Sequence, residues 1–300
     1  MRSFSLLATL GLVLAAAACV PADEALPLGS AQFTITGRGS PRVLSEDVVV
    51  DEWSIHVDRF LIAFHTMTIV NLNDSGQCAY RGRGAQTNVV FDGTEGSVVQ
   101  AFNGIQPGDC TDVGMRLGPP DDFTTVGEGA TPADLVTLVT GRPAHALLEA
   151  TATHKSKSGD VAAHEVMKVS LRFDTERTSS AFGGCRDAVP GVKIRPEARY
   201  AVFMSLAAEA FFRDAIANGA ELRFTPFVDS DARGNNDGTV TMDELDLLPL
   251  SEAPGQFYQL PSGGRSGTFG DYVRAQFMFA AKYGNGGGCD GIVPGTQLDQ

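Results

Sequence analysis

The segment from residue 229 to residue 244 carries oxygen-bearing side chains at spacings suited to holding a divalent cation. Asn235 and Asp237 stand two residues apart, Gly238 occupies a position for a sharp turn, and Glu244 follows six residues later. Calcium takes about six to eight oxygen ligands, so alternate side chains on a tight loop supply single oxygens and a closing glutamate supplies two. The predicted calcium ligands are Asp229, Asp231, Asn235, Asp237, Thr239 through its carbonyl, and Glu244, with Thr241 or a water completing the shell.

The second half of this segment resembles the EF-hand calcium loop, but its start departs from that pattern. Counting back from Gly238, the first ligand position falls on Arg233, which cannot bind a cation. A two-residue insertion would bring in Asp231, or else Asp229, as the first ligand. Residues 221–227 read as a strand, so we expect no incoming helix and a single EF-like loop with a structural role. The alternative interpretation is a solvated acidic turn.

The first nineteen residues have the pattern of an export signal. Arg2 gives a positive start, residues 6–18 are apolar or small, and Cys19 follows directly. The run is short for a membrane-spanning helix, which needs roughly 20 apolar residues. The thiol after three alanines resembles the bacterial lipobox, although Ala16 stands where that motif usually has leucine. The resemblance implies a lipoprotein acylated at Cys19 (diacylglycerol and an amide-linked acyl chain such as palmitate); the alternative is a plain secretory signal cut near Ala18.

An exported chain implies a particular organisation and location. We expect a signal peptide at 1–18, a lipidated tether at 19–30, one β-sandwich domain at 31–291 and a tail at 292–300. Val20, rather than an acidic residue, follows the lipid site, which by analogy favours the outer membrane of the cell envelope. The predicted partners are the membrane, through the lipid anchor, and an unidentified protein or other envelope component.

The charge balance is acidic. The chain has 36 Asp and Glu against 23 Lys and Arg, which gives a net charge of −13. Nucleic acid is excluded as an expected partner, because phosphate binding depends on clustered basic residues. Divalent cations suit this charge, although most of it serves solubility.

Four cysteines remain after Cys19, and an even number of thiols in an oxidising compartment indicates disulfides. Four cysteines allow three pairings. We favour Cys78 with Cys110, which lie in neighbouring turn-like segments, and Cys185 with Cys289, which would join two glycine-rich segments. A zinc site is the weaker alternative, because the chain has no paired C-x-x-C spacing.

Alternating apolar and polar residues predict a mainly antiparallel all-β sandwich with a few short helices. The expected strands cover residues 31–37, 53–57, 60–70, 87–91, 145–154, 162–173 and 198–206, and the stretch 60–70 is apolar on both faces, as in a central strand. Helices are expected within 205–216, near 132–139 and at 271–283, the last of them an amphipathic C-terminal helix. A hairpin turn is expected at 155–160.

The five histidines support a different metal hypothesis. His56 and His65 could converge on adjacent strands, and His154 could approach His164 across the expected hairpin. Imidazoles suit copper or zinc, so the alternative function is a periplasmic transition-metal accessory protein. His145 enters neither pair.

Catalytic motifs are absent from the sequence, so an enzyme is not expected. Lys168 stands where a zinc-protease helix begun at His164 and Glu165 needs its second histidine, and Thr268 replaces the second glycine of a nucleophile elbow. The acidic loop together with the Gly-Gly-Gly-Cys289 tail resembles predicted envelope lipoproteins of proteobacteria. That resemblance implies location and calcium binding but no reaction. The favoured hypothesis is therefore a non-catalytic, envelope-anchored binding module with a structural calcium ion.

Overall fold

The computed structural model describes residues 27–36, 42–72, 78–81, 85–105, 111–155, 166–186, 195–217, 219–255, 257–284 and 287–292. Its strands are β1 (Gly29–Thr36), β2 (Val43–Leu44), β3 (Trp53–Leu72), β4 (Cys78–Arg81), β5 (Ala85–Asp92), β6 (Ser97–Ile105), β7 (Thr111–Leu117), β8 (Thr125–Val126), β9 (Ala144–His154), β10 (Val166–Asp174), β11 (Ala181–Arg186), β12 (Arg199–Leu206), β13 (Thr239–Thr241), β14 (Ala281–Tyr283) and β15 (Gly287–Ile292). Its helices are α1 (Pro132–Val139), the 3₁₀ helix η1 (Ala208–Phe212), α2 (Thr225–Arg233), α3 (Met242–Leu245) and α4 (Phe269–Ala280).

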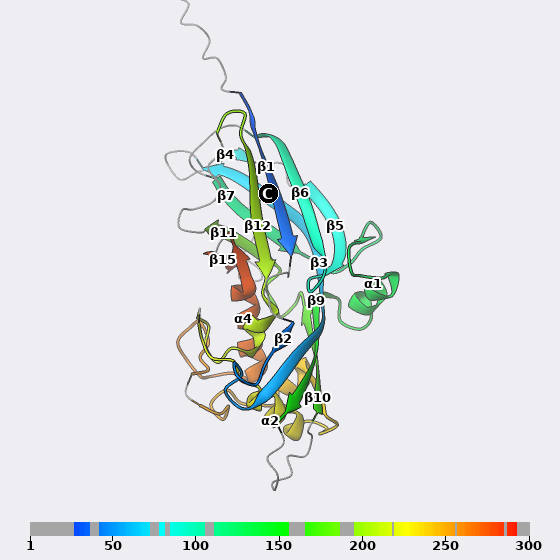
Figure 1. Cartoon of the computed structure of the whole chain (residues 1–300), viewed down its shortest axis with the longest axis vertical. Coiled ribbons are helices and arrows are strands. Elements are labelled where there is room, and N and C mark those ends of the chain that lie inside the picture. The colour runs from blue at the N-terminus through cyan, green and yellow to red at the C-terminus, as the bar shows by residue number, and fades with distance from the viewer. Residues whose placement is uncertain are drawn as a thin grey trace, which may run out of the picture.

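Strands account for 45% of the structure against 18% for helices, which confirms the predicted all-β, sandwich-like class. The strands form one continuous hydrogen-bonded sheet in the order β13-β10-β9-β3-β7-β11-β15-β14-β12-β1-β6. Most pairs are antiparallel, and the parallel ones are β1 with β12, β10 with β13, and β5 with β8. The β6-β1-β12 end lies apart from the helices, which gather at the other end of the molecule (Figure 1).

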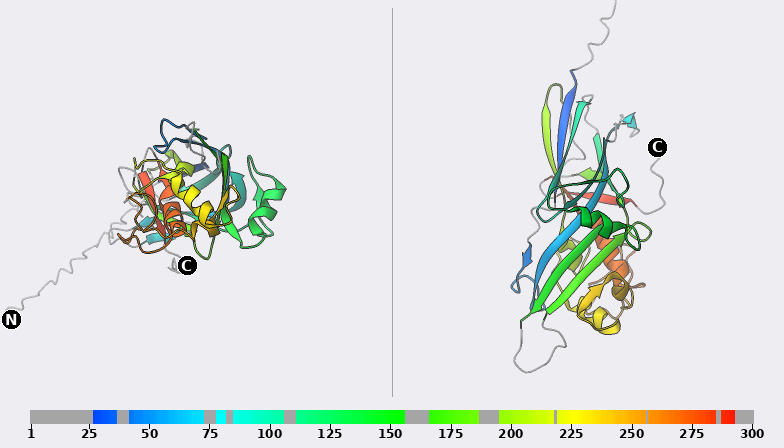
Figure 2. Two further views of the ribbon diagram at one scale, coloured as in Figure 1. Left: turned by 90° about the horizontal axis from the view of Figure 1, so that it is seen from below. Right: turned by 90° about the vertical axis from the view of Figure 1, so that its right-hand side faces the viewer.

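Strand β3 joins the two ends. Its first half pairs with β9, and its second half pairs with β7. As the doubly apolar sequence predicts, consecutive side chains are buried on both faces in the middle of this strand, at residues 60–64. Phe60 and Ile62 enter the main core, whereas Leu61 and Ala63 enter a smaller cluster beneath α1. In the side view, β3, β9 and β10 form one layer, with α1 on its outer face and the other helices behind it (Figure 2).

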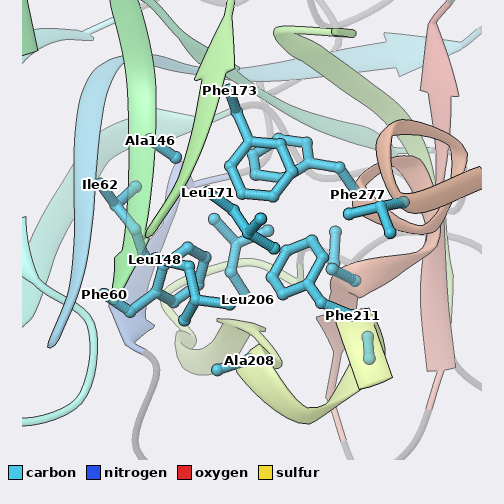
Figure 3. Close-up of a cluster of buried hydrophobic side chains, with 14 of the residues drawn as sticks. Phe60, Ile62, Ala146, Leu148, Leu171, Phe173, Leu206, Ala208, Phe211 and Phe277 are labelled. Atoms are coloured by element: carbon cyan, nitrogen blue, oxygen red, sulfur yellow. The ribbon is translucent and has the colours of Figure 1, made fainter. Parts of the chain in front are cut away.

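The main core is aromatic where the strands meet η1 and α4. Phe173 of β10 lies 4.6 Å from Phe277 of α4, and Phe60 lies 5.8 Å from Phe211 of η1, measured between ring centroids. Leu148 and other aliphatic side chains fill the space between these rings (Figure 3). Buried aromatic pairs of this kind contribute area and a preferred ring geometry.

Two predicted helices differ in extent from the structure. The expected helix within 205–216 is only the 3₁₀ turn η1, because β12 continues to Leu206. The C-terminal helix begins earlier than predicted, at Phe269, since Thr268 caps it through a hydrogen bond from the Asp271 amide. It ends at Ala280, where the chain turns into β14 and pairs with β12. Most of its side chains are buried, so it is a core helix more than an amphipathic one.

Candidate functional site

The predicted calcium segment begins with a helix, so the expected strand at 221–227 is wrong. Leu222 forms only isolated bridges to Val49 and Arg213, and α2 starts at Thr225. The helix begins at this point because a residue far away in the sequence caps it. A carboxylate oxygen of Asp51 accepts hydrogen bonds from the amides of Phe224 and Thr225 at 2.7 and 2.6 Å, which satisfies amides that a helix start leaves free. An incoming helix therefore precedes the loop.

Asp231 lies at the C-terminal end of α2, and its side chain is buried inside the loop. The Gly238 amide donates a hydrogen bond to Asp231 Oδ2 at 3.3 Å. Gly238 has a φ of 81°, which only glycine adopts without strain. Arg233 is exposed and pairs with Glu252 outside the loop. Asp231 is thus turned toward the loop and Arg233 away from it, while the predicted insertion relative to the EF-hand pattern stays a prediction.

The middle of the loop is held by side chains that bond to the next main-chain amides. The Asp237 amide donates to Asn235 Oδ1 at 3.0 Å, and the Thr239 amide donates to Asp237 Oδ1 at 2.8 Å. The Asn235 amide side chain also donates to Asp237 Oδ2 at 3.0 Å. Both residues are exposed, so their oxygens remain accessible from solvent.

Glu244 closes the segment from α3. Its Oε1 accepts a hydrogen bond from the Asn235 amide at 3.3 Å, and its Oε2 accepts from the amide and hydroxyl of Thr241 at 2.8 and 2.9 Å. The side chain is buried. It approaches the loop so closely that a Cβ on Gly234 would lie 2.5 Å from Oε1, which explains a glycine at that position.

The loop packs on the sheet and not on a second loop. Strand β13 lies parallel to β10, with Val240 opposite Val169, and the Lys168 amide donates to the Gly238 carbonyl at 2.8 Å. Val240 is fully buried. The sheet edge therefore fixes the turn from the outside, while Asp231 and Glu244 fix it from the inside.

These residues supply a calcium-type donor set in part. Asp231, Asn235 and Glu244 contact one short stretch of main chain, and all present oxygens, as a hard cation requires. Asp229 lies in α2 at intermediate burial, which raises the pKa of its carboxyl, and no described contact joins it to the loop.

The conformation described here is not a finished coordination shell. Within the described ranges, no three carboxylate, imidazole or thiolate side chains lie close enough together to hold a metal ion. The residues fit calcium if Asn235 and main-chain carbonyls also serve as ligands, and if the Glu244 carboxylate leaves its hydrogen bonds with Thr241 to bind the ion.

Among the described histidines, His56 and His65 do not converge. His56 Nδ1 lies 2.8 Å from Asp58 Oδ1, and His65 lies 4.0 Å from Asp121. The two histidines are nine residues apart on β3, or about 30 Å at a rise of about 3.3 Å per residue. The His154 ring packs against Trp53, on the opposite sheet face from His56. His164 lies outside the described residues, so its predicted approach to His154 stays a prediction.

One of the predicted disulfides is present. Cys185 of β11 and Cys289 of β15 are bonded, with an S–S distance of 2.02 Å. Cys78 begins β4, whereas Cys110 and Cys19 lie outside the described residues. The Cys78–Cys110 pair and the lipid site remain predictions.

Sequence reasoning missed the burial of His145. His145 of β9 is 0% exposed and packs its ring 5.1 Å from that of Phe277, with neither ring nitrogen hydrogen-bonded in the described structure. Burial lowers the pKa of His145 to about 3, against a smaller opposing effect of Asp174. The pairing of β9 with β10 shifts register beside Asp174, at the position of His145. The alternating sequence of β9 does not predict this shift.

Comparison of the chain with protein-family models, with curated proteins and with solved structures finds no match. Among the described residues, no helix has both the length and the apolar character needed to cross a membrane. The functional argument therefore depends on the residues themselves.

Proposed function

We propose that this chain is a non-catalytic lipoprotein of the bacterial cell envelope, a binding module whose folded part holds one structural calcium ion in the 229–244 loop. The observation that supports the calcium site best is the pair of buried carboxylates, Asp231 and Glu244, that reach the same loop main chain from its two ends. Both side chains direct carboxylate oxygens, the ligands that calcium prefers, toward the same loop.

Calcium would act on the fold and not as a signal. Asp231, Asp237 and Glu244 put three negative charges into one short loop, and no Lys or Arg of the described residues forms an ion pair with Glu244. Ion binding would relieve that repulsion and would stabilise the folded state by mass action. The loop is attached to β10, and no second calcium loop pairs with it among the described residues, so the pair opening of a sensor EF-hand is not expected.

The proposed lipid anchor would hold this domain close to the membrane. Cys19 precedes the start of β1 at Gly29 by ten residues, which span at most about 35 Å when extended. The proposed location is the outer membrane, with an envelope protein or polymer as the partner. The lipid is tested by mass spectrometry of the protein from the membrane fraction: Cys19→Ala should abolish both the acyl mass and the membrane association.

Calorimetric titration of calcium into chelator-treated protein tests the ion site. We expect one ion per chain and a higher unfolding temperature when calcium is present. Glu244→Gln should weaken binding at least tenfold, since it removes the ligand that supplies two oxygens. The matched control is Asp243→Asn, which removes the same charge one residue away, where an exposed carboxylate faces Arg142 at 3.0 Å outside the loop.

The outcomes separate the hypotheses. Equal loss in both variants would mean that general charge, and not the loop, attracts the ion. No binding by the unaltered protein would reject the calcium site. Copper or zinc found by elemental analysis of the purified protein, with no calcium, would favour the histidine alternative instead.

A further inference from the structure

A cavity of about 280 Å³ opens where η1, α4, β14 and β15 meet, away from the acidic loop. Three charged side chains line it: Glu209 of η1, Arg213 directly after η1, and Lys282 of β14. Ile216, Ala217 and Phe279 give it an apolar wall. The size is near the lower end for small-molecule sites, about 300 Å³, and the mixture of an apolar wall with a few polar groups is typical of them.

No described ion pair joins Glu209 to Arg213 in this cavity. Glu209 Oε2 is buried and has no hydrogen-bond partner among the described residues. The Arg213 guanidinium makes one hydrogen bond there, from Nη1 to the Ala220 carbonyl at 2.7 Å, and no described carboxylate pairs with it. A buried carboxylate oxygen without a donor is costly, so this arrangement favours a ligand that supplies one.

Lys282 adds a second positive charge to the same space. Burial lowers the pKa of Lys282, the positive charge of Arg213 lowers it further, and Glu209 acts in the opposite direction. The three groups are therefore close enough to influence one another. The lining of the cavity thus contains two basic side chains and one acidic side chain.

The walls of the cavity are fixed before any ligand binds. The Arg213 carbonyl accepts hydrogen bonds from Tyr272 Oη at 2.8 Å and Gln276 Nε2 at 3.3 Å, both on α4. On the other side, Cys289 is tied to β11 through its disulfide with Cys185. Such preorganisation reduces the entropy that a ligand must lose on binding.

We propose that the cavity binds a small zwitterion of the α-amino-acid class with an apolar side chain. Its carboxylate would face Arg213 and Lys282, its ammonium would donate to Glu209, and its side chain would lie against the apolar wall. A simple anion would leave Glu209 without a donor, and a simple cation would meet two like charges. This ligand site goes beyond the envelope role and depends on neither the calcium ion nor the lipid.

Calorimetric titration of the purified full-length protein with leucine tests the proposal, at neutral pH and with and without calcium. The comparison ligands are 4-methylpentanoate, which lacks the ammonium, and leucinamide, which lacks the carboxylate. We expect leucine to bind, and each comparison ligand to bind at least tenfold more weakly, as expected for the loss of a hydrogen bond to a charged group.

Two variants assign the contacts. Glu209→Gln should weaken leucine binding at least tenfold and should not weaken that of 4-methylpentanoate, which no longer meets a negative charge, whereas Arg213→Gln should weaken both. Lys282→Met serves as a second test of the carboxylate end if Arg213→Gln does not fold, which a thermal melt reveals. The matched control is Glu252→Gln, at an exposed ion pair with Arg233 outside the cavity, and it should change nothing.

Several results would overturn the proposal. One is the absence of binding by leucine, valine, methionine and alanine at millimolar concentration. Another is binding of 4-methylpentanoate as tightly as leucine, which would make the cavity a site for simple anions. The calcium titration is a separate experiment. A negative result with leucine therefore does not reject the calcium site, and a negative result with calcium does not reject the amino-acid site.

Discussion

At the β6-β1-β12 end of the sheet, strands from distant parts of the chain are joined by apolar side chains. At the β10-β13 end, a short stretch of chain is joined to itself by polar ones. Phe33 of β1 packs 5.8 Å from Phe102 of β6, and β1 pairs with β12 from residue 199 onward. In the acidic loop, carboxylates bond to amides within ten residues. We therefore expect the stability of the β6-β1-β12 end to depend on apolar packing, and the stability of the β10-β13 end to depend on bound ions and pH.

The largest expected effect is at the apolar end. Phe33→Ala removes a side chain that is 0% exposed, so we expect a loss of about 3–5 kcal/mol in the free energy of unfolding, measured by urea denaturation. The control is Phe203→Ala on the neighbouring strand β12, where the ring is 60% exposed and the loss should be small. Equal losses would mean that this end is not held by its inner face.

Calcium should act on the opposite end. With free calcium at a hundred times its dissociation constant, we expect about 2.7 kcal/mol of added stability. Hydrogen exchange should slow most at the Asn235, Gly238 and Thr241 amides and least in β1. If calcium slowed hydrogen exchange equally at both ends, the expected difference between the two ends would be wrong.

Low pH should also lower the free energy of unfolding, through a buried histidine in the half of the molecule that the helices cover. The folded-state pKa of His145, about 3, is below its unfolded value of about 6.5, so between these values the unfolded chain binds a proton that the folded chain does not. Stability should therefore fall as the pH falls below 6.5, by about 2 kcal/mol between pH 7 and pH 5. Urea denaturation at both values should show this slope reduced in His145→Leu, whose side chain cannot take up a proton.

The smallest effect is expected at the start of α4. Thr268→Ala removes the hydroxyl that accepts a hydrogen bond from the Asp271 amide at 3.1 Å, and caps of this kind contribute about 1 kcal/mol. Ser266→Ala, two residues earlier and exposed, is the control. A change in thermal unfolding that is no larger than the control's would show that packing alone holds this helix.

The same contrast explains what the sequence could predict. The alternation in β3, β9 and β12 revealed strands, because each has a buried face, and the glycine-rich segments around Cys185 and Cys289 indicated the disulfide. The strand signals are local, whereas the disulfide joins cysteines 104 residues apart and was indicated by the composition around each of them.

Features that depend on distant partners were not predictable. The segment before Asp229 reads as a strand by composition, but Asp51 caps it as a helix from more than 170 residues away. The parallel pairing of β1 with β12 leaves no trace in either strand. The charged cavity combines side chains from three separate segments, so no sequence motif predicts it.

The position of β1 between two partners has a consequence for biosynthesis. Its antiparallel neighbour β6 is made soon after it, but its parallel neighbour begins only at Arg199, with Ser30 opposite. Non-local pairing of this kind is slow to form. A chain arrested before residue 199 would carry the alternating edge of Ala31, Phe33 and Ile35 with no strand on one side, and open edges of that type recruit other chains. Synthesis or export that stalls in the middle of the chain should therefore yield aggregates, whereas a stall after β12 should not.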